Sequence, residues 1–281
     1  MALMLFAALL ILSASCSAQD KESATPVVAI PDPKLEELIR QVLKRRGIEK
    51  DELAAEDMAR IYYLNGAARG IKDLTGLEHC VSLQEAHFPN NEIVGVAPLA
   101  KCVRVRVLTL TNNQIQNIEP LKPMVQLRAL RLEQNKIENA EHLAALTELT
   151  TLRLSNNPLK SIDGLGGLTR LHSLALRSTG LKDLNVIAKL PQLGMLDLRD
   201  NELADLSAMT TLTKMRFLLL DNNRVSEISP LQDLAKQHPD ASSLMVLSLT
   251  GNQLGTSEID ALKRARYRVQ FRQPQTAGGT M

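Results

Sequence analysis

A register of 22 residues runs through most of the chain. Aligned on Leu-x-x-Leu-x-Leu-x-x-Asn-x-Leu/Ile, its second apolar position recurs every 22 residues from Leu64 to Leu218, then 29 residues later at Leu247. Leucine accounts for 50 of the 281 residues. A fixed period of this length is typical of solenoids, in which each repeat packs only on its neighbours. The sequence therefore predicts one elongated domain of nine coils, with seven extra residues around positions 236–242.

Each column of the repeat has a physical role. Side chains alternate along a strand, so a Leu-x-Leu pair points both leucines into the core and the middle residue to solvent. Apolar residues at every third place in the other half of the repeat, as at Ile115 and Ile118, predict 3₁₀ turns on a convex side. Asparagine side chains can satisfy backbone groups where each coil leaves its strand, which predicts a structural ladder. The ladder comprises Asn91, Asn113, Asn135, Asn157, Asn201, Asn223 and Asn252, with Arg69 and Thr179 at the other two places.

Both ends of the array are expected to be covered. Asp32 as N-cap, Pro33 at the first helical position and an apolar stripe that ends before Gly47 predict a helix, followed by a short one over 52–60. At the other end, residues 256–266 suggest a helix, and Tyr267, Val269 and Phe271 alternate as in a strand. We expect a helical N-terminal cap over 31–60, nine repeats over 61–255, a C-terminal cap over 256–272 and a frayed tail over 273–281.

These motifs resemble the 22-residue leucine-rich repeats of bacterial internalin-type proteins, and the segment from Pro31 to Arg60 is similar to their helical front cap. The repeat class also resembles the regulatory subunit of the type-1 protein phosphatase. The resemblance covers about residues 31–272. It implies an α/β solenoid, a right-handed superhelix with a parallel concave sheet, that binds a protein partner on its concave face. The chain has no Trp, so no aromatic-rich partner site of either family is transferred to it.

The N-terminal residues resemble an export signal. An apolar run from Ala2 to Leu12 followed by small residues and Cys16 has the length of a signal-peptide core and resembles a bacterial lipobox. We expect a signal peptide over 1–16, lipidation at Cys16, a flexible linker over 17–30, and attachment to a membrane of the cell envelope through the lipid. Cleavage after Ala18, which would give a plainly secreted protein, is the alternative.

The concave columns contain an apolar cluster of Met195, Phe217, Leu219 and Val246 at places where a solvated sheet carries polar residues. Contiguous exposed apolar surface usually marks an interaction site. The alternative is that the C-terminal cap or the seven-residue insertion folds over the cluster.

The same face carries Arg131, Arg153, Arg177 and Arg199 on successive coils, with Arg128 and Arg216 nearby. Neighbouring like charges repel, so an anionic partner surface or a sugar acid could be their purpose. A solvated face balanced by Glu133, Asp197 and Asp221 is the favoured alternative. We hypothesise that the arginines and the apolar cluster form one protein-binding surface.

No catalytic constellation emerges. The net charge of +2 disfavours nucleic acid, and the five histidines occupy different columns. Cys80 and Cys102 hold equivalent core positions and are expected to be free buried thiols, and we expect no metal and no cofactor. The prediction is a monomeric, non-enzymatic protein–protein interaction module. A structural envelope spacer and a cytoplasmic phosphatase-regulator-like scaffold are the alternatives.

Overall fold

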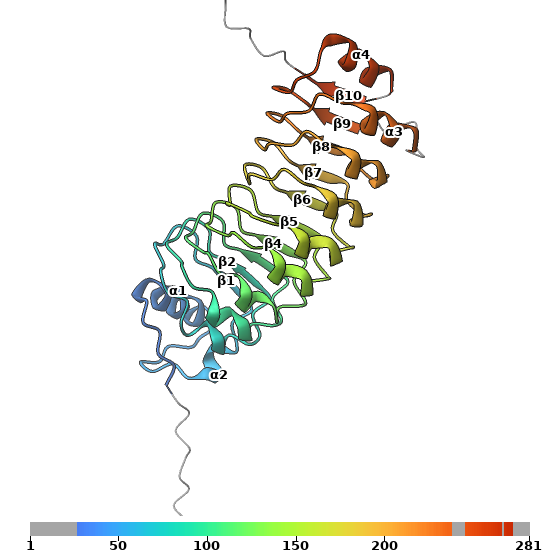
Figure 1. Cartoon of the computed structure of the whole chain (residues 1–281). Helices are drawn as coiled ribbons and strands as arrows, with labels where there is room; N and C mark the ends of the chain where they lie inside the picture. The colour runs from blue at the N-terminus through green and yellow to red at the C-terminus, as the bar shows by residue number, and fades with distance from the viewer. Residues whose placement is uncertain (1–26, 238–244, 266, 272–281) are drawn as a thin grey trace, which may run out of the picture.

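The computed structural model describes residues 27–237, 245–265 and 267–271, and these form one elongated solenoid (Figure 1). Its strands all lie in one parallel sheet whose spatial order is the chain order. The strands are β1 (Tyr63–Asn65), β2 (Glu85–His87), β3 (Val107–Thr109), β4 (Ala129–Arg131), β5 (Thr151–Arg153), β6 (Ser173–Ala175), β7 (Met195–Asp197), β8 (Phe217–Leu219), β9 (Met245–Ser248) and β10 (Tyr267–Gln270). The predicted α/β leucine-rich repeat solenoid with a parallel sheet and a helical N-terminal cap is confirmed.

The 22-residue register of the sequence is the pairing register of the sheet. Leu108 faces Ala86 on one side and Leu130 on the other, and all three side chains are fully buried. Because equivalent leucines stack from coil to coil, the core is one continuous apolar column along the solenoid axis.

In the first seven coils the half opposite the sheet is built from 3₁₀ helices, as predicted (Figure 1). They are η1 (Leu77–His79), η2 (Ala97–Lys101), η3 (Glu119–Leu121), η4 (Glu141–Ala145), η5 (Asp163–Gly167), η6 (Asn185–Lys189) and η7 (Ser207–Thr211). A short polar side chain two residues before η3 to η7 accepts a hydrogen bond from the first backbone N–H of the helix, for example Asp205 from Ser207 at 2.8 Å. This contact satisfies a donor that has no partner within the helix.

A second column, not anticipated from the sequence, has left-handed backbone. It lies directly before the asparagine column and comprises Ala68, Asn90, Asn112, Gln134, Asn156, Ser178, Asp200 and Asn222, with φ between 53° and 58°. Asparagine tolerates this region better than most residues, which explains the recurring Asn-Asn pairs.

The asparagine side chains tie neighbouring coils together. Asn113 donates from Nδ2 to the Phe88 and Leu110 carbonyls at 2.9 and 3.0 Å, and its Oδ1 accepts from the Ile93 N–H at 3.0 Å. At Thr179 the pattern is reduced, because the hydroxyl has one hydrogen, which it can donate either to the Leu176 carbonyl at 2.8 Å or to Asn201 Oδ1 at 3.1 Å.

The N-terminal cap consists of α1 (Pro33–Lys44) and the short α2 (Ala55–Met58). The second helix is shorter than the predicted span of 52–60, because Leu53 and Ala54 pair with the extended segment before α1: the Val28 N–H donates to the Leu53 carbonyl at 2.7 Å, and Val27 bridges Ala54. Val28 is buried. Residues 27–30, assigned above to the linker, therefore belong to the folded body.

Toward the C-terminal end, α3 (Ser229–Gln237) replaces a 3₁₀ helix in the eighth coil. It is followed by residues 238–244, which include most of the insertion and lie outside the described residues. The cap helix α4 (Thr256–Arg264) ends two residues before the predicted end, and β10 pairs in parallel with β9. The predicted strand of the cap thus extends the sheet.

Residues 1–26, with the expected signal peptide and Cys16, and the tail from 272 onward lie outside the described residues. In the described part, no helix has the length and apolar character needed to span a membrane.

Candidate functional site

The four apolar residues of the predicted cluster lie together near the C-terminal end of the sheet. Met195, Phe217 and Val246 are register partners on β7, β8 and β9, and Leu219 lies two residues along β8. Phe217 is 47% exposed, and the other three are half-buried. We call this set the C-terminal patch. With the described part of the C-terminal cap in place, the patch still reaches solvent.

The four arginines divide into two pairs with different surroundings. Arg177 and Arg199 follow β6 and β7 and have close acidic partners. Arg199 donates to both carboxylate oxygens of Asp197, at 2.8 and 2.7 Å, and Arg177 donates to Asp200. Asp200, one of the left-handed residues, is the partner that sequence reasoning missed. These two arginines fit the balanced solvated face described above.

These ion pairs shift the pKa values of Arg199 and Asp200. The hydrogen bond to Asp197 raises the pKa of Arg199, helped by the nearby Asp221 and Asp200 carboxylates. Burial raises the pKa of Asp200, but donors from Asn222 and Arg177 outweigh it, and the net pKa is lowered. Arg199 and Asp200 are thus held in their charged forms around neutral pH.

Arg131 and Arg153 differ. They are register partners on β4 and β5, at the middle of the sheet. Arg131 is exposed, and among the described residues its side chain makes no hydrogen bond or ion pair. Arg153 comes no closer than 3.8 Å to Glu133, and its buried Nε has no hydrogen-bond partner in the described part of the chain. Glu133 in turn accepts a hydrogen bond from the Thr111 hydroxyl at 2.7 Å.

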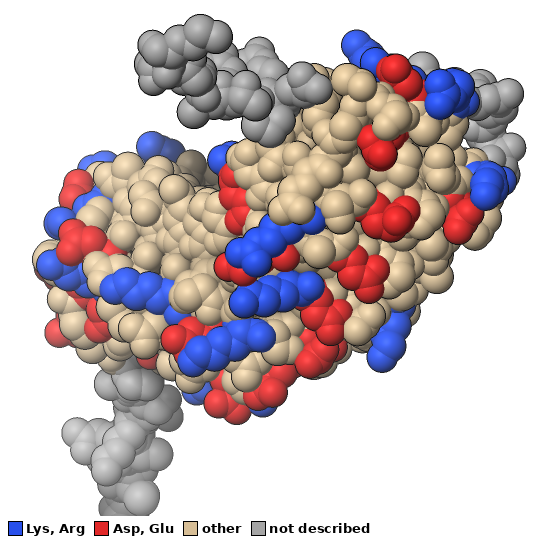
Figure 2. Space-filling view, turned by 45° about the horizontal axis from the view of Figure 1, so that its top comes forward, with Lys and Arg blue, Asp and Glu red and all other residues tan. Residues whose placement is uncertain are grey.

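Basic and acidic side chains are interspersed on the surface and do not form separate basic and acidic regions. Figure 2 shows long basic side chains next to one another, with acidic groups beside them, on a largely uncharged surface. Asp221, expected above to balance arginine, accepts from the Ser248 hydroxyl at 2.6 Å and from the Thr250 N–H at 2.8 Å. The face therefore has local charge patterns and no single-sign potential.

An aromatic group that the sequence analysis did not single out lies at the opposite end of the face, in the first repeat. Tyr63 on β1 is 48% exposed, and its ring centroid lies 5.6 Å from that of His87 on β2. The His87 Nδ1 is 3.1 Å from the Thr109 hydroxyl. Counting back 22 residues from Glu85 would have placed Tyr63 in the same column.

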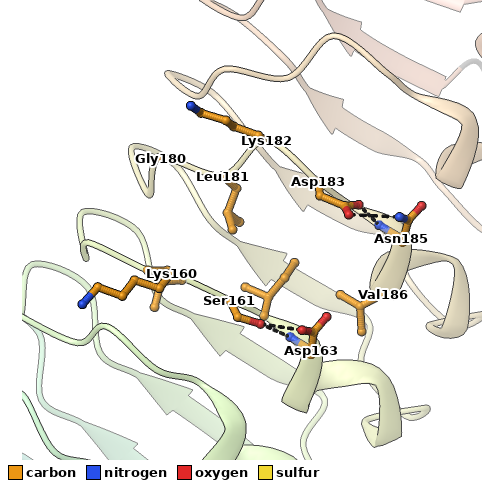
Figure 3. A pocket seen from close by; sticks show the side chains of 11 residues that line it. Lys160, Ser161, Asp163, Gly180, Leu181, Lys182, Asp183, Asn185 and Val186 are labelled. Atoms are coloured by element: carbon orange, nitrogen blue, oxygen red, sulfur yellow. Dashed lines mark hydrogen bonds between the residues drawn. The ribbon is translucent and has the colours of Figure 1, made fainter.

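A cleft of about 320 Å³ opens between two coils at residues 159–163 and 180–186 (Figure 3). Ser161 bonds to Asp163 and Asp183 to Asn185 within their own coils, whereas the lysines of the cleft, Lys160 and Lys182, pair with Glu138 and Glu202 of the coils on either side. The cleft is thus a parting between coils without convergent chemical groups.

Cys80 and Cys102 are free and buried, as predicted. Burial raises the pKa of both thiols, that of Cys102 to about 12. Within the described ranges, no three His, Cys, Asp or Glu side chains gather to hold a metal ion.

Comparison with known proteins agrees with this geometry. The family described as Leucine Rich repeats (2 copies) matches residues 125–167 and 147–193. No curated protein sequence matches the chain significantly.

Solved structures give a wider match. Internalin C2 from Listeria monocytogenes is 26% identical with a TM-score of 0.71, covering 78% of this chain and 93% of that one. An internalin (InlF) of the same species is 20% identical with a TM-score of 0.57, covering 90% and 95%. A leucine-rich repeat protein of Leptospira interrogans is 20% identical with a TM-score of 0.63, covering 70% of this chain and 50% of that one. The chain thus has a leucine-rich repeat fold similar to that of the internalins, and this fold is that of a protein–protein interaction module.

Proposed function

We propose that this protein is an exported, lipid-anchored, non-enzymatic module that binds a protein partner on its concave face. The observation that carries the proposal is the C-terminal patch. Phe217 is large, apolar and nearly half exposed on a sheet surface, with Met195 and Val246 as its register neighbours. Exposed aromatic residues in a contiguous apolar patch are frequent anchors of protein interfaces.

Photocrosslinking tests the binding surface. A p-benzoylphenylalanine at position 217 is expected to give a defined adduct with one protein in cells, and Leu219→Ala is expected to reduce its yield. The matched control is the same photoreactive residue at Val125, which is 49% exposed in the turn between η3 and β4. Equal adducts from positions 217 and 125, or none from 217, would refute concave-face binding.

Lipid anchoring is tested separately, by intact mass and fractionation of the wild type beside Cys16→Ala. We expect the wild type to lack residues 1–15, to have the added mass of acyl chains and to sediment with membranes, and the variant to lose all three properties. Cleavage after Ala18 without added mass would instead indicate plain secretion. Full-length protein in the cytoplasm would overturn export and direct the search to intracellular partners.

A further inference from the structure

Two arginines at the middle of the concave face lack the neutralisation that their neighbours have. Arg131 and Arg153 stand opposite each other on adjacent parallel strands, whose backbones are ~4.8 Å apart. Like charges at directly paired positions of a sheet repel. In the next two coils, Arg177 and Arg199 each bind a close carboxylate.

No comparable partner reaches the central pair. Arg131 has no such partner within the described residues. The Glu133 carboxylate is 3.8 Å from Arg153 and accepts a hydrogen bond of 2.7 Å from the Thr111 hydroxyl. Arg153 also holds a buried Nε–H without an acceptor in the described ranges. A buried donor with no acceptor costs free energy, so this conformation of Arg153 is not stabilised as those of Arg177 and Arg199 are.

Further positive charge borders the pair. Arg106 and Arg128 are exposed at the residues that directly precede β3 and β4, and among described residues neither side chain has an ion-pair partner. The planar guanidinium fork matches a carboxylate in two parallel hydrogen bonds, and two adjacent forks suit one or two carboxylates.

The surrounding acidic residues restrict what can approach. Glu133, Asp197 and Asp200 lie on the same face or at the turns that border it, so an anionic polymer long enough to run along the whole sheet would be repelled by these carboxylates at Arg153, Arg177 and Arg199. A protein can place one or two acidic side chains at the arginines and apolar or basic ones elsewhere. Charge complementarity therefore favours a protein over a polysaccharide.

We propose that Arg131 and Arg153 form a seat for an acidic side chain of the protein partner. The proposal rests on the proposed function and specifies the chemistry of the partner. The C-terminal patch on β8 is three to four strands from the seat, or ~14–19 Å along the sheet. The partner surface is thus expected to carry an Asp or Glu at about that distance from an apolar anchor.

The test is direct binding of a fluorescein-labelled hexaglutamate peptide to the full chain at low ionic strength, with hexaglutamine as the uncharged control. We expect R131Q/R153Q to weaken hexaglutamate binding at least ~10-fold, the range of two lost charge-assisted hydrogen bonds. R170Q/R177Q removes the same charge from arginines that already have acidic partners, and is expected to change binding less than ~2-fold.

The contrary outcomes are distinct. Absence of hexaglutamate binding, or equal weakening by the two double variants, would overturn the seat in favour of a diffuse field. Tighter, arginine-dependent binding of hexagalacturonate would overturn the protein partner in favour of a polysaccharide. Because hexaglutamate has no apolar anchor, Phe217→Ala/Leu219→Ala should leave its binding unchanged, so this test does not depend on the fate of the C-terminal patch.

Discussion

Asp32 joins the N-terminal cap to the first coil through one carboxylate. Its Oδ1 accepts from the Lys34 and Leu35 N–H groups at 2.9 and 3.1 Å, as the N-cap of α1. Its Oδ2 accepts from the Lys72 and Asp73 N–H groups at 2.7 and 3.1 Å, in the first repeat. Burial raises the pKa of Asp32, but the four backbone donors outweigh it and the net pKa is lowered. The N-cap role was predictable from the sequence, whereas the second set of bonds depends on a contact 40 residues away.

Asp32→Asn is therefore expected to destabilise the protein by about 1–3 kcal/mol at pH 7, because an amide cannot accept at both of its ends. Since the folded pKa is lowered, the wild-type carboxylate stabilises the fold fully above its unfolded pKa of about 3.9, and this contribution is lost as the pH falls through the folded value. Urea unfolding of both proteins between pH 7 and pH 3.5 checks this. The stability gap should shrink toward the acid end, and a constant gap would contradict the ionic origin of the effect.

The asparagine ladder gives a second residue-scale prediction. Asn135→Ala removes the donor to the Leu110 and Leu132 carbonyls and the acceptor of the Ile115 N–H, all buried. We expect a loss of about 2–4 kcal/mol in the free energy of unfolding, from the cost of several unsatisfied buried groups. Thr179→Val, at the reduced position of the ladder, should cost less because its hydroxyl donates one hydrogen bond at a time, to the Leu176 carbonyl or to Asn201 Oδ1. If urea titrations gave equal losses of unfolding free energy for Asn135→Ala and Thr179→Val, the asparagine would contribute no more than the fewer hydrogen bonds of Thr179.

At the scale of elements, close packing of the 3₁₀ helices limits which glycines can change. A Cβ on Gly164, in η5, would lie 2.4 Å from the Glu141 Cα and 2.8 Å from the Ala140 carbonyl oxygen of the coil before it. These are backbone atoms, so the coils would have to separate. A Cβ on Gly167, in the same 3₁₀ helix, would have its nearest neighbour at 3.7 Å.

Gly164→Ala should consequently destabilise the protein by about 1–3 kcal/mol through overpacking. Gly167→Ala is the matched control, and should be neutral or stabilise by up to about 1 kcal/mol because alanine restricts the unfolded chain. Thermal unfolding of the two variants side by side measures both effects. If Gly167→Ala proved as harmful as Gly164→Ala, steric contact between η4 and η5 would not be the cause.

The sequence predicted the elements that repeat and missed those that depend on contacts outside the repeat. The strands, the 3₁₀ turns and the buried cysteines follow from column identity alone. The length of α2 does not, because its start is set by pairing with residues 27 and 28. For the same reason the sequence placed the arginines on the concave face but did not show which of them have an acidic partner. Arg177 has one and Arg131 does not, because the turn that contains Asp200 directs its carboxylate toward Arg177.

At the scale of the whole molecule, a solenoid is held together by nearest-neighbour contacts, so its stability is close to a sum over coils and interfaces. Cys80 and Cys102 are fully buried in the first coils, near the N-terminal cap. Opening of that end can thus be observed separately from the rest.

We expect both thiols to resist alkylation in the native protein at pH 8, since burial excludes the reagent and the raised pKa values leave almost no thiolate. Asp32→Asn, which loosens the N-terminal cap, should accelerate labelling of both. Gly164→Ala, several coils away, should have a smaller effect even at equal loss of overall stability. Mass spectrometry of the Cys80 and Cys102 peptides measures this, and identical acceleration by the two variants would indicate that the array unfolds as one unit.

Because the register is constant, sites on the concave face are separated by whole numbers of strand spacings. Gain or loss of one complete 22-residue coil between β5 and β8 would preserve every type of coil-to-coil bond, yet would move the arginines and Phe217 apart or together by one strand spacing, ~4.8 Å. Duplication or deletion of single coils could therefore change partner choice in discrete steps, with no new core packing to evolve.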